Sequence, residues 1–228
     1  MCLNGLRYRT FYNYIFKKVR NIMKKFFVLI AVAIVSMSAM AQVQFGGKVG
    51  FDMTHFWGKD VGHDLVPNYQ LGLMMEYKFN PSFAIAPEVV FAAQGGKESE
   101  DGAKVTYHTN YINVPVMLKF YATPSFSIDF GPQVGFNVYS KATAAYSGYK
   151  ATLDIKEMTN LVDFGVGLGC TYNLTNNAFV QARYNLGLTK AFKGGSEKFD
   201  YEGYDIELSG DSPDVKNGNI QIAFGMKF

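Results

Sequence analysis

Apolar and polar residues alternate with a period of two along eight segments of the chain. In residues 162–172, apolar or aromatic side chains occupy every second position, and Asp163, Thr171 and three glycines occupy the positions between them. This alternation predicts β-strands with one apolar face and one polar face. The predicted strands comprise residues 44–53, 69–79, 83–94, 112–120, 126–138, 162–172, 180–188 and 219–228.

The chemistry of the two faces indicates which of them is turned outward. A soluble sandwich or lipocalin-like barrel hides its apolar face, and its outer face carries Lys and Glu in nearly every strand. Here the polar face is small and its charges are of both signs, whereas the apolar face is bulky and ends in aromatic residues. A lipid-facing apolar belt around a narrow polar lumen has this pattern. Strands of roughly 10 residues are also long enough to cross a bilayer when tilted.

The predicted connections alternate in length. Short turns are expected at 80–82, 122–125 and 173–177, and longer polar loops at 54–68, 95–106, 140–159 and 190–216. Short periplasmic turns and long outer loops are typical of outer-membrane barrels. The predicted fold is therefore all-β, an eight-stranded antiparallel up-and-down transmembrane β-barrel with both ends of the mature chain in the periplasm. Closure leaves no open sheet edge in the hydrocarbon region.

Three prolines fall inside predicted strands, at Pro87, Pro115 and Pro132. A proline removes one hydrogen bond from a β-ladder, so these positions oppose a fully paired sheet. Bulges at the prolines would reconcile them with the strand assignment.

The first part of the chain predicts export. Residues 23–41 have a basic start, an apolar stretch and a small-residue ending at Ala39 and Ala41, which predicts a signal peptide cleaved before Gln42. Residues 1–22 precede it as an N-terminal extension that we attribute to a misassigned start, and residues 42–228 form the barrel domain. The expected location is the outer membrane.

Removal of that leader changes the charge balance. The whole chain has 22 Lys+Arg and 19 Asp+Glu, and seven of the basic residues lie in residues 1–41. The mature chain then has 15 basic and 19 acidic residues, a net charge of −4. This balance excludes a basic nucleic-acid-binding protein.

Charged residues on the polar faces are the most distinctive candidate site. An eight-stranded barrel has room only for its own side chains, so opposite charges there are expected to pair as a plug. A proton or ligand path through the same charges is the alternative. The expected lumen network comprises Lys48, Glu76, Lys78, Glu88, Lys119, Asp129, Asp163, Arg183 and Lys227.

Other polar residues are candidates for metal or catalytic sites. His55, Asp60, His63 and Asp64 match no tight metal-ligand spacing, and the acidic residues of 190–216 lack the regular pattern of a calcium loop. A nucleophilic site would need His55, His63 or His108 beside a serine such as Ser140 or Ser147, and no Gly-x-Ser-x-Gly motif occurs. We expect no metal, no cofactor and no enzymatic activity, with a loop-based enzyme as the remote alternative.

Several strand sequences resemble those of the PorT-like outer-membrane β-barrel proteins. The resemblance is carried, in the same order along the chain, by residues 83–97, 111–119, 130–135, 163–169 and 182–188, and it spans about 43–228. It implies the same fold and membrane, and it makes the three prolines features of the family. It also implies that barrel-assembly machinery recognises the last strand through Ile222, Phe224, Met226 and Phe228. Some members of the family are linked to protein-secretion or gliding machinery.

The expected function is that of a membrane anchor or scaffold with a plugged lumen. Its partners would be outer-membrane lipid, the assembly machinery during insertion, and a protein or surface molecule contacted by the long outer loops. An accessory subunit of a secretion or gliding machine is the main alternative.

Overall fold

The computed structural model describes residues 43–59, 65–100, 103–146, 149–193, 195–201, 204–210 and 214–228. The predicted extension 1–22, the signal peptide 23–41 and the cleavage residues Ala39, Ala41 and Gln42 lie outside this described part. Asp60, His63 and Asp64 also lie outside it. Within the described residues, no helix is long and apolar enough to span a membrane.

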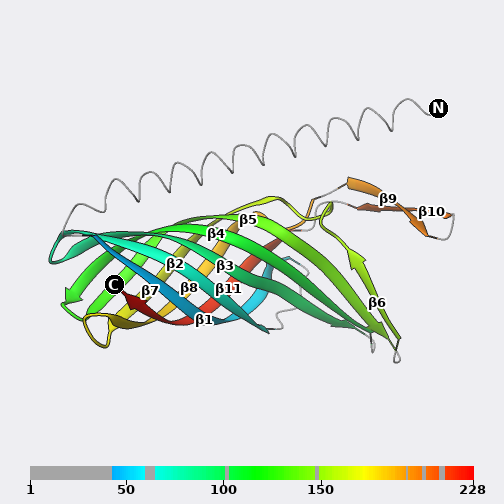
Figure 1. Ribbon diagram of the computed structural model, residues 1–228. Helices are drawn as coiled ribbons and strands as arrows, with labels where there is room; N and C mark the ends of the chain where they lie inside the picture. The colour runs from blue at the N-terminus through cyan, green and yellow to red at the C-terminus, as the bar shows by residue number, and fades with distance from the viewer. Residues whose placement is uncertain are drawn as a thin grey trace. The chain divides into compact units, whose positions relative to one another are not determined.

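Eight antiparallel strands close into a barrel (Figure 1). β1 pairs with β11, the last strand, and β4 pairs with β5, so the sheet has no open edge around the barrel. The barrel strands are β1 (Val43–Gly58), β2 (Val66–Asn80), β3 (Phe83–Glu100), β4 (Ala103–Thr123), β5 (Phe126–Tyr146), β7 (Val162–Asn173), β8 (Ala178–Lys190) and β11 (Val215–Lys227). The predicted eight-stranded fold is confirmed.

The short turns and the carboxyl end of β11 lie at one end of the barrel, the turn end (Figure 1). The opposite end is called the loop end. At the turn end, Asn80 Oδ1 accepts hydrogen bonds from the backbone N–H groups of Ser82 and Phe83, both at 2.9 Å. The Thr175 hydroxyl accepts one from the Ala178 N–H at 2.9 Å. Polar side chains thus close these connections locally, at positions where the sequence predicted short turns.

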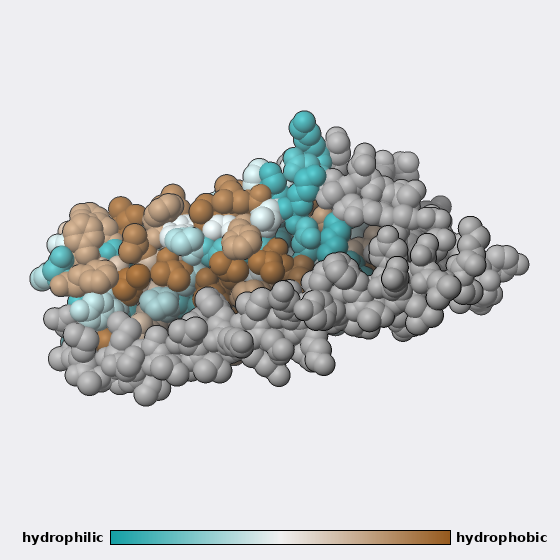
Figure 2. Space-filling model, turned by 90° about the horizontal axis from the view of Figure 1, so that it is seen from above, coloured by the Kyte–Doolittle hydropathy of each residue, from teal (hydrophilic) through white to brown (hydrophobic). Residues whose placement is uncertain are grey.

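The two faces of the strands differ sharply in exposure. Ile222 on the outer face of the barrel is 63% exposed, whereas Lys48 on the inner face is 2% exposed. This distribution is the inverse of a soluble protein, and it is the expected one when the outer face contacts lipid. Figure 2 shows the resulting hydrophobic belt on one side of the barrel, with hydrophilic surface toward the loop end.

The predicted strands are too short at the loop end. Residues 95–100, expected in a loop, pair with residues 103–108 as extensions of β3 and β4. β5 continues to Tyr146 and pairs with β6 (Tyr149–Asp154), so much of the predicted loop 140–159 is also strand. The predicted loop 190–216 contains a separate two-stranded sheet of β9 (Gly195–Tyr201) and β10 (Tyr204–Gly210). The extension of β3 has no apolar alternation, whereas β6 (Tyr149, Ala151, Leu153) and β10 (Tyr204, Ile206, Leu208) alternate only over short runs inside polar segments that were assigned to loops.

The bulges expected at the prolines are absent from the described strands. Pro87 pairs with Val116, Pro115 with Gln133 and Pro132 with Val166, and none of these positions shifts the register. The shifts in β4 lie elsewhere, at Asn110/Tyr111 and Tyr121/Thr123. The bulge hypothesis is therefore wrong, and the strands tolerate the missing donors without an inserted residue.

Candidate functional site in the barrel lumen

Three charged side chains from distant strands meet at the centre of the lumen. Lys48 Nζ in β1 lies 2.6 Å from Glu88 Oε2 in β3. Arg183 in β8 donates from both terminal nitrogens to the two oxygens of Glu88, at 2.9 and 2.7 Å. We call Lys48, Glu88 and Arg183 the central triad. All three side chains are buried and shielded from water. The negative charge of Glu88 therefore compensates the positive charges of Lys48 and Arg183 through charge-assisted hydrogen bonds.

A second buried pair joins β4 and β5. Lys119 Nζ lies 2.9 Å from Asp129 Oδ2 and also donates to the Thr171 hydroxyl at 2.9 Å. The Ser127 hydroxyl donates to Asp129 Oδ1 at 2.7 Å. Asp129 therefore has an ion-pair partner and a hydroxyl donor on its other oxygen.

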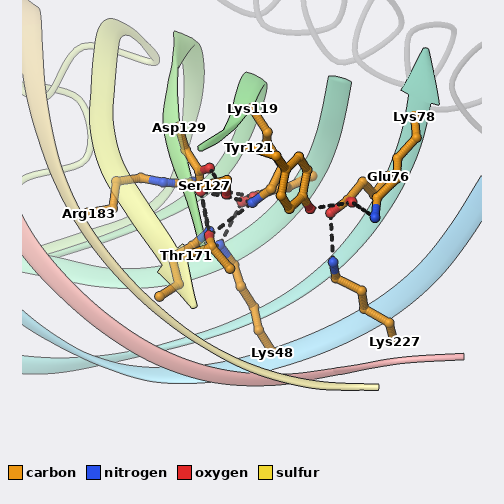
Figure 3. Close-up of polar contacts among 12 residues, drawn as sticks. Lys48, Glu76, Lys78, Lys119, Tyr121, Ser127, Asp129, Thr171, Arg183 and Lys227 are labelled. Carbon is orange, nitrogen blue, oxygen red and sulfur yellow. Dashed lines mark hydrogen bonds and ion pairs between the residues drawn. The ribbon is translucent and has the colours of Figure 1, made fainter. Parts of the chain in front are cut away.

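One glutamine connects this pair to the central triad. Gln181 Oε1 accepts a hydrogen bond from Lys48 Nζ at 2.8 Å, and Gln181 Nε2 donates to Asp129 Oδ2 at 3.3 Å. The two ion groups are thus one continuous network across the lumen. Figure 3 shows Lys48, Thr171, Asp129 and Lys119 grouped in this way.

A third pair lies nearer the turn end. Lys227 Nζ lies 2.9 Å from Glu76 Oε2, and the Tyr121 hydroxyl donates to Glu76 Oε1 (Figure 3). Lys78 Nζ approaches the same carboxylate only to 4.0 Å, and its side chain is 40% exposed. Lys78 is therefore a peripheral member of the network rather than part of the plug.

Apolar side chains fill the space between these ion groups. Met74, Ala86, Met117 and Phe179 form a buried cluster inside the barrel. The Phe179 ring also lies 5.6 Å from Lys227 Nζ, within range of a cation–π contact. This half of the lumen is packed with the protein's own side chains.

Of the nine residues predicted as a lumen network, Asp163 alone forms no ion pair with the described residues. Its carboxylate accepts hydrogen bonds from the Thr189 hydroxyl at 2.6 Å and from Asn217 Nδ2 at 3.1 Å. Expecting a charge partner for Asp163 was wrong, because the strands beside it present neutral amides and a hydroxyl. The loop-end half of the lumen thus holds its carboxylate through neutral hydrogen-bond donors, whereas the other half holds its carboxylates through ion pairs.

Four side chains of the network were not predicted from the sequence. Ser127, Thr171 and Gln181 lie on the polar faces of their strands, and that position in the alternation was the available signal. Tyr121 lies just beyond the predicted strand end at residue 120, in a part of β4 where no alternation marks it. Its contact with Glu76 depends on two strands that are not adjacent in sequence.

The remaining candidate residues that the structure describes do not assemble into a catalytic or metal site, and Ser147, like His63, lies outside the described residues. His55 lies in β1, not in a loop, and its ring stacks on Tyr184 with centroids 6.1 Å apart. His108 is exposed whereas Ser140 is buried and donates to Asn137 Oδ1 at 3.0 Å, so the two lie on opposite faces. Among the described residues, no group of three or more His, Cys, Asp or Glu side chains could hold a metal ion.

The last strand presents the predicted insertion residues on the barrel exterior. Ile222, Phe224, Met226 and Phe228 are all exposed. The Phe228 N–H donates to the Phe45 carbonyl at 2.8 Å and completes the seam between first and last strands. Recognition of these residues by assembly machinery stays a prediction.

Solved structures that resemble the chain include outer-membrane proteins. Ail of Yersinia pestis has a TM-score of 0.49 and 15% identity, over 82% of this chain and 99% of that one. Neisserial surface protein A has a TM-score of 0.45 and 12% identity, over 81% and 97%. OprG from Pseudomonas aeruginosa has a TM-score of 0.39 and 17% identity, over 81% and 95%. No curated protein matches the chain.

A sequence-family model provides the assignment. The model described as "Outer membrane protein beta-barrel domain" matches residues 37–193, which is more than half of the chain. The match includes the strands that carry the central triad and the Lys119–Asp129 pair. This family is broader than the PorT-like group, and membership of the PorT-like group stays a prediction. The chain belongs to the outer membrane protein β-barrel domain family, and the protein is located in the outer membrane.

Proposed function

We propose that the protein is an anchored scaffold whose barrel transports nothing and whose loop end binds a partner at the cell surface. The observation that supports this most directly is the closed lumen. The central triad, the Lys119–Asp129 pair and the apolar cluster around Phe179 occupy its cross-section with buried, mutually bonded side chains. An eight-stranded barrel has no further room for solute.

The proposed binding region is the strand extension at the loop end. There β5 and β6 pair from Lys141↔Asp154 to Tyr146↔Tyr149, and β6 is the terminal strand of its sheet. Lys150 to Asp154 are all exposed, and Leu153 is an exposed apolar side chain among them. In a membrane-anchored protein, an edge strand with exposed side chains offers a partner both backbone hydrogen bonds and side-chain contacts.

Crosslinking in intact outer membranes tests this proposal. A Lys150→Ser/Leu153→Ser variant removes one basic and one apolar exposed side chain from β6. The matched control is Lys78→Ser/Leu174→Ser, which makes the same two replacements at the turn end, where Leu174 is also exposed. We expect the β6 variant to lose crosslinked partners that the wild type and the control retain. Identical partners for all three proteins would contradict a binding role for β6.

The PorT-like resemblance supports a second candidate, an accessory subunit of a secretion or gliding machine. The crosslinking experiment described above distinguishes the two candidates by the molecules that are recovered with the protein. A stoichiometric complex with secretion components favours the second candidate, whereas surface molecules bound without them favour the scaffold.

We also propose that barrel-assembly machinery recognises β11 during insertion. Support comes from the outward alternation of Ile222, Phe224, Met226 and Phe228 at the carboxyl end of the chain.

A further inference from the structure

The part of β5 that pairs with β6 at the loop end forms a ribbon with two chemically different faces. We call residues 141–146 of β5 and 149–154 of β6 the β5–β6 ribbon (Figure 1). One face carries the apolar cross-strand pairs Ala142↔Leu153 and Ala144↔Ala151, and Leu153 is 46% exposed there. The other, mostly polar face carries the pairs Lys141↔Asp154, Thr143↔Thr152 and Ala145↔Lys150.

The outer edge of β6 presents the backbone groups of every second residue. The Ile155 N–H donates to the Ser140 carbonyl at 3.2 Å, so the backbone groups of Ile155 point toward β5. Successive residues of a strand turn their N–H and C=O groups to opposite sides. Those of Lys150, Thr152 and Asp154 therefore point to the outer edge, and β6 is the terminal strand of its sheet. Lys150 and Asp154 form no ion pair with other described residues, so both charges are available at this edge.

Two copies of β6 can pair antiparallel in several registers, and the side chains select one of them. The register centred on Thr152 places Lys150 of one copy opposite Asp154 of the other, at two symmetric positions. It also places Ala151 opposite Leu153, so the apolar faces of the two ribbons become continuous. Registers centred on Lys150 or Asp154 place like charges opposite one another. Those centred on Ala151 or Leu153 form no pair of opposite charges.

We propose that the partner bound by β6 is a second copy of this chain, paired antiparallel through β6 in the register centred on Thr152. This inference rests on the proposed binding role of β6 and names the partner. About six backbone hydrogen bonds join the two edges. A lysine on an edge strand usually opposes pairing with another chain, and here Asp154 of the second copy compensates the charge of Lys150. The contact uses the same surface of both copies, so it closes at a dimer.

Disulfide trapping in isolated outer membranes tests the register. In a cysteine-free background, Cys2→Ser/Cys170→Ala, the Thr152→Cys variant should give a covalent dimer on mild oxidation. The reason is that directly opposed residues of antiparallel strands have Cα atoms about 4.5–5.5 Å apart, which suits a disulfide. Thr143→Cys is the matched control, because Thr143 lies on the same face but one strand farther from the open edge. Its two copies are about 14 Å apart in the proposed dimer, so this variant should stay monomeric. No covalent dimer for Thr152→Cys, or equal yields for the two variants, would overturn the proposal.

Charge reversal tests the Lys150–Asp154 contact. Lys150→Asp and Asp154→Lys each place like charges opposite one another at both symmetric positions, and each should weaken self-association about tenfold or more. The two variants should pair with each other when they are produced together, because the carboxylates of one then face the ammonium groups of the other. Co-purification of differently tagged copies measures this association. Heat-modifiable mobility on gels confirms that each variant is folded. Failure of two folded variants to pair with each other would overturn the proposed register.

The same experiments separate this inference from the proposed function. If the wild type does not self-associate but Lys150→Ser/Leu153→Ser still loses other crosslinked molecules, β6 binds a different partner. The dimer is then refuted and the binding role of β6 stands. If the copies do not associate and the variant loses no crosslinked molecule, both the dimer and the binding role are refuted.

Discussion

Lys48 Nζ and Glu88 Oε2 lie 2.6 Å apart inside the barrel, although the two residues are 40 positions apart in the chain. Arg183 completes the central triad from the opposite part of the sequence. The triad has two cations and one carboxylate. The buried Asp52 carboxylate lies on the same strand as Lys48, and its Oδ2 accepts a hydrogen bond from Gln221 Nε2 at 3.4 Å. Each charged group in this part of the lumen therefore depends on one or two buried partners for its charge compensation or hydrogen bonding.

Glu88→Ala should destabilise the barrel strongly. The substitution leaves Lys48 and Arg183 buried without their shared carboxylate, and breaking a buried pair in this way costs about 3–5 kcal/mol. The measurement is the free energy of unfolding by urea in detergent or lipid vesicles. Lys78→Ala is the control, because Lys78 is partly exposed and its 4.0 Å contact should be worth about 0–1 kcal/mol. Equal stabilities for the two variants would refute a buried triad.

The Lys119–Asp129 pair should show strong non-additivity. Lys119→Met and Asp129→Leu should each destabilise the barrel, because each leaves one buried charge alone. The double variant should be less destabilised than the sum of the two, since replacing both ions with apolar groups removes both desolvation costs. A double-mutant cycle in urea measures the coupling. Coupling near zero would show that the two side chains do not interact in the folded barrel.

Leu168→Arg should impair insertion or stability because Leu168 is 59% exposed on the membrane-facing side of β7. Arginine on the lipid face near the bilayer midplane costs about 2–4 kcal/mol. Leu153→Arg is the matched control, since Leu153 is 46% exposed on β6, beyond the barrel belt. Heat-modifiable mobility on gels measures the folded fraction. Wild-type folding of Leu168→Arg would contradict the assignment of this face to lipid.

Gly131→Ala should destabilise the contact between β4 and β5. A Cβ atom at Gly131 would meet the Val116 carbonyl oxygen at 2.0 Å, so the backbone must shift. Overpacking of this kind costs about 1–3 kcal/mol. Gly47→Ala is the control, because the nearest atom to its added Cβ would be 3.8 Å away. Urea unfolding should separate the two variants, and an unaffected Gly131→Ala would show that the two strands are farther apart than described.

Phe228→Ala should lower the amount of barrel in the outer membrane without a comparable loss of stability after refolding in detergent. Phe228 is 81% exposed, so its removal deletes few internal contacts. Phe79→Ala, another exposed aromatic position at the turn end, serves as the control. Membrane fractionation of cells measures the assembled amount. Equal assembly of both variants would argue against recognition of the carboxyl-terminal residue.

The amino-acid sequence by itself determined the strands of the barrel belt, their two faces and the short turns. These features are local, because a period of two places alternate side chains on opposite faces whatever the partner strand is. That parity places Lys48, Glu88 and Arg183 on the polar faces of their strands, and the bulky apolar chemistry of the opposite faces indicates that the polar faces point inward. Asn80 and Thr175 likewise close their turns through contacts with residues two or three positions away.

Only the tertiary structure decided which charges meet and which do not. Strand closure and register bring Lys48, Glu88 and Arg183 together, whereas Asp163 lies among amides. The extensions of β3 to β6 were missed for a related reason. These segments pair with one another beyond the lipid belt. Alternating runs there, such as Tyr149, Ala151 and Leu153, are short and stand among polar residues, so the local pattern was too weak to predict strands.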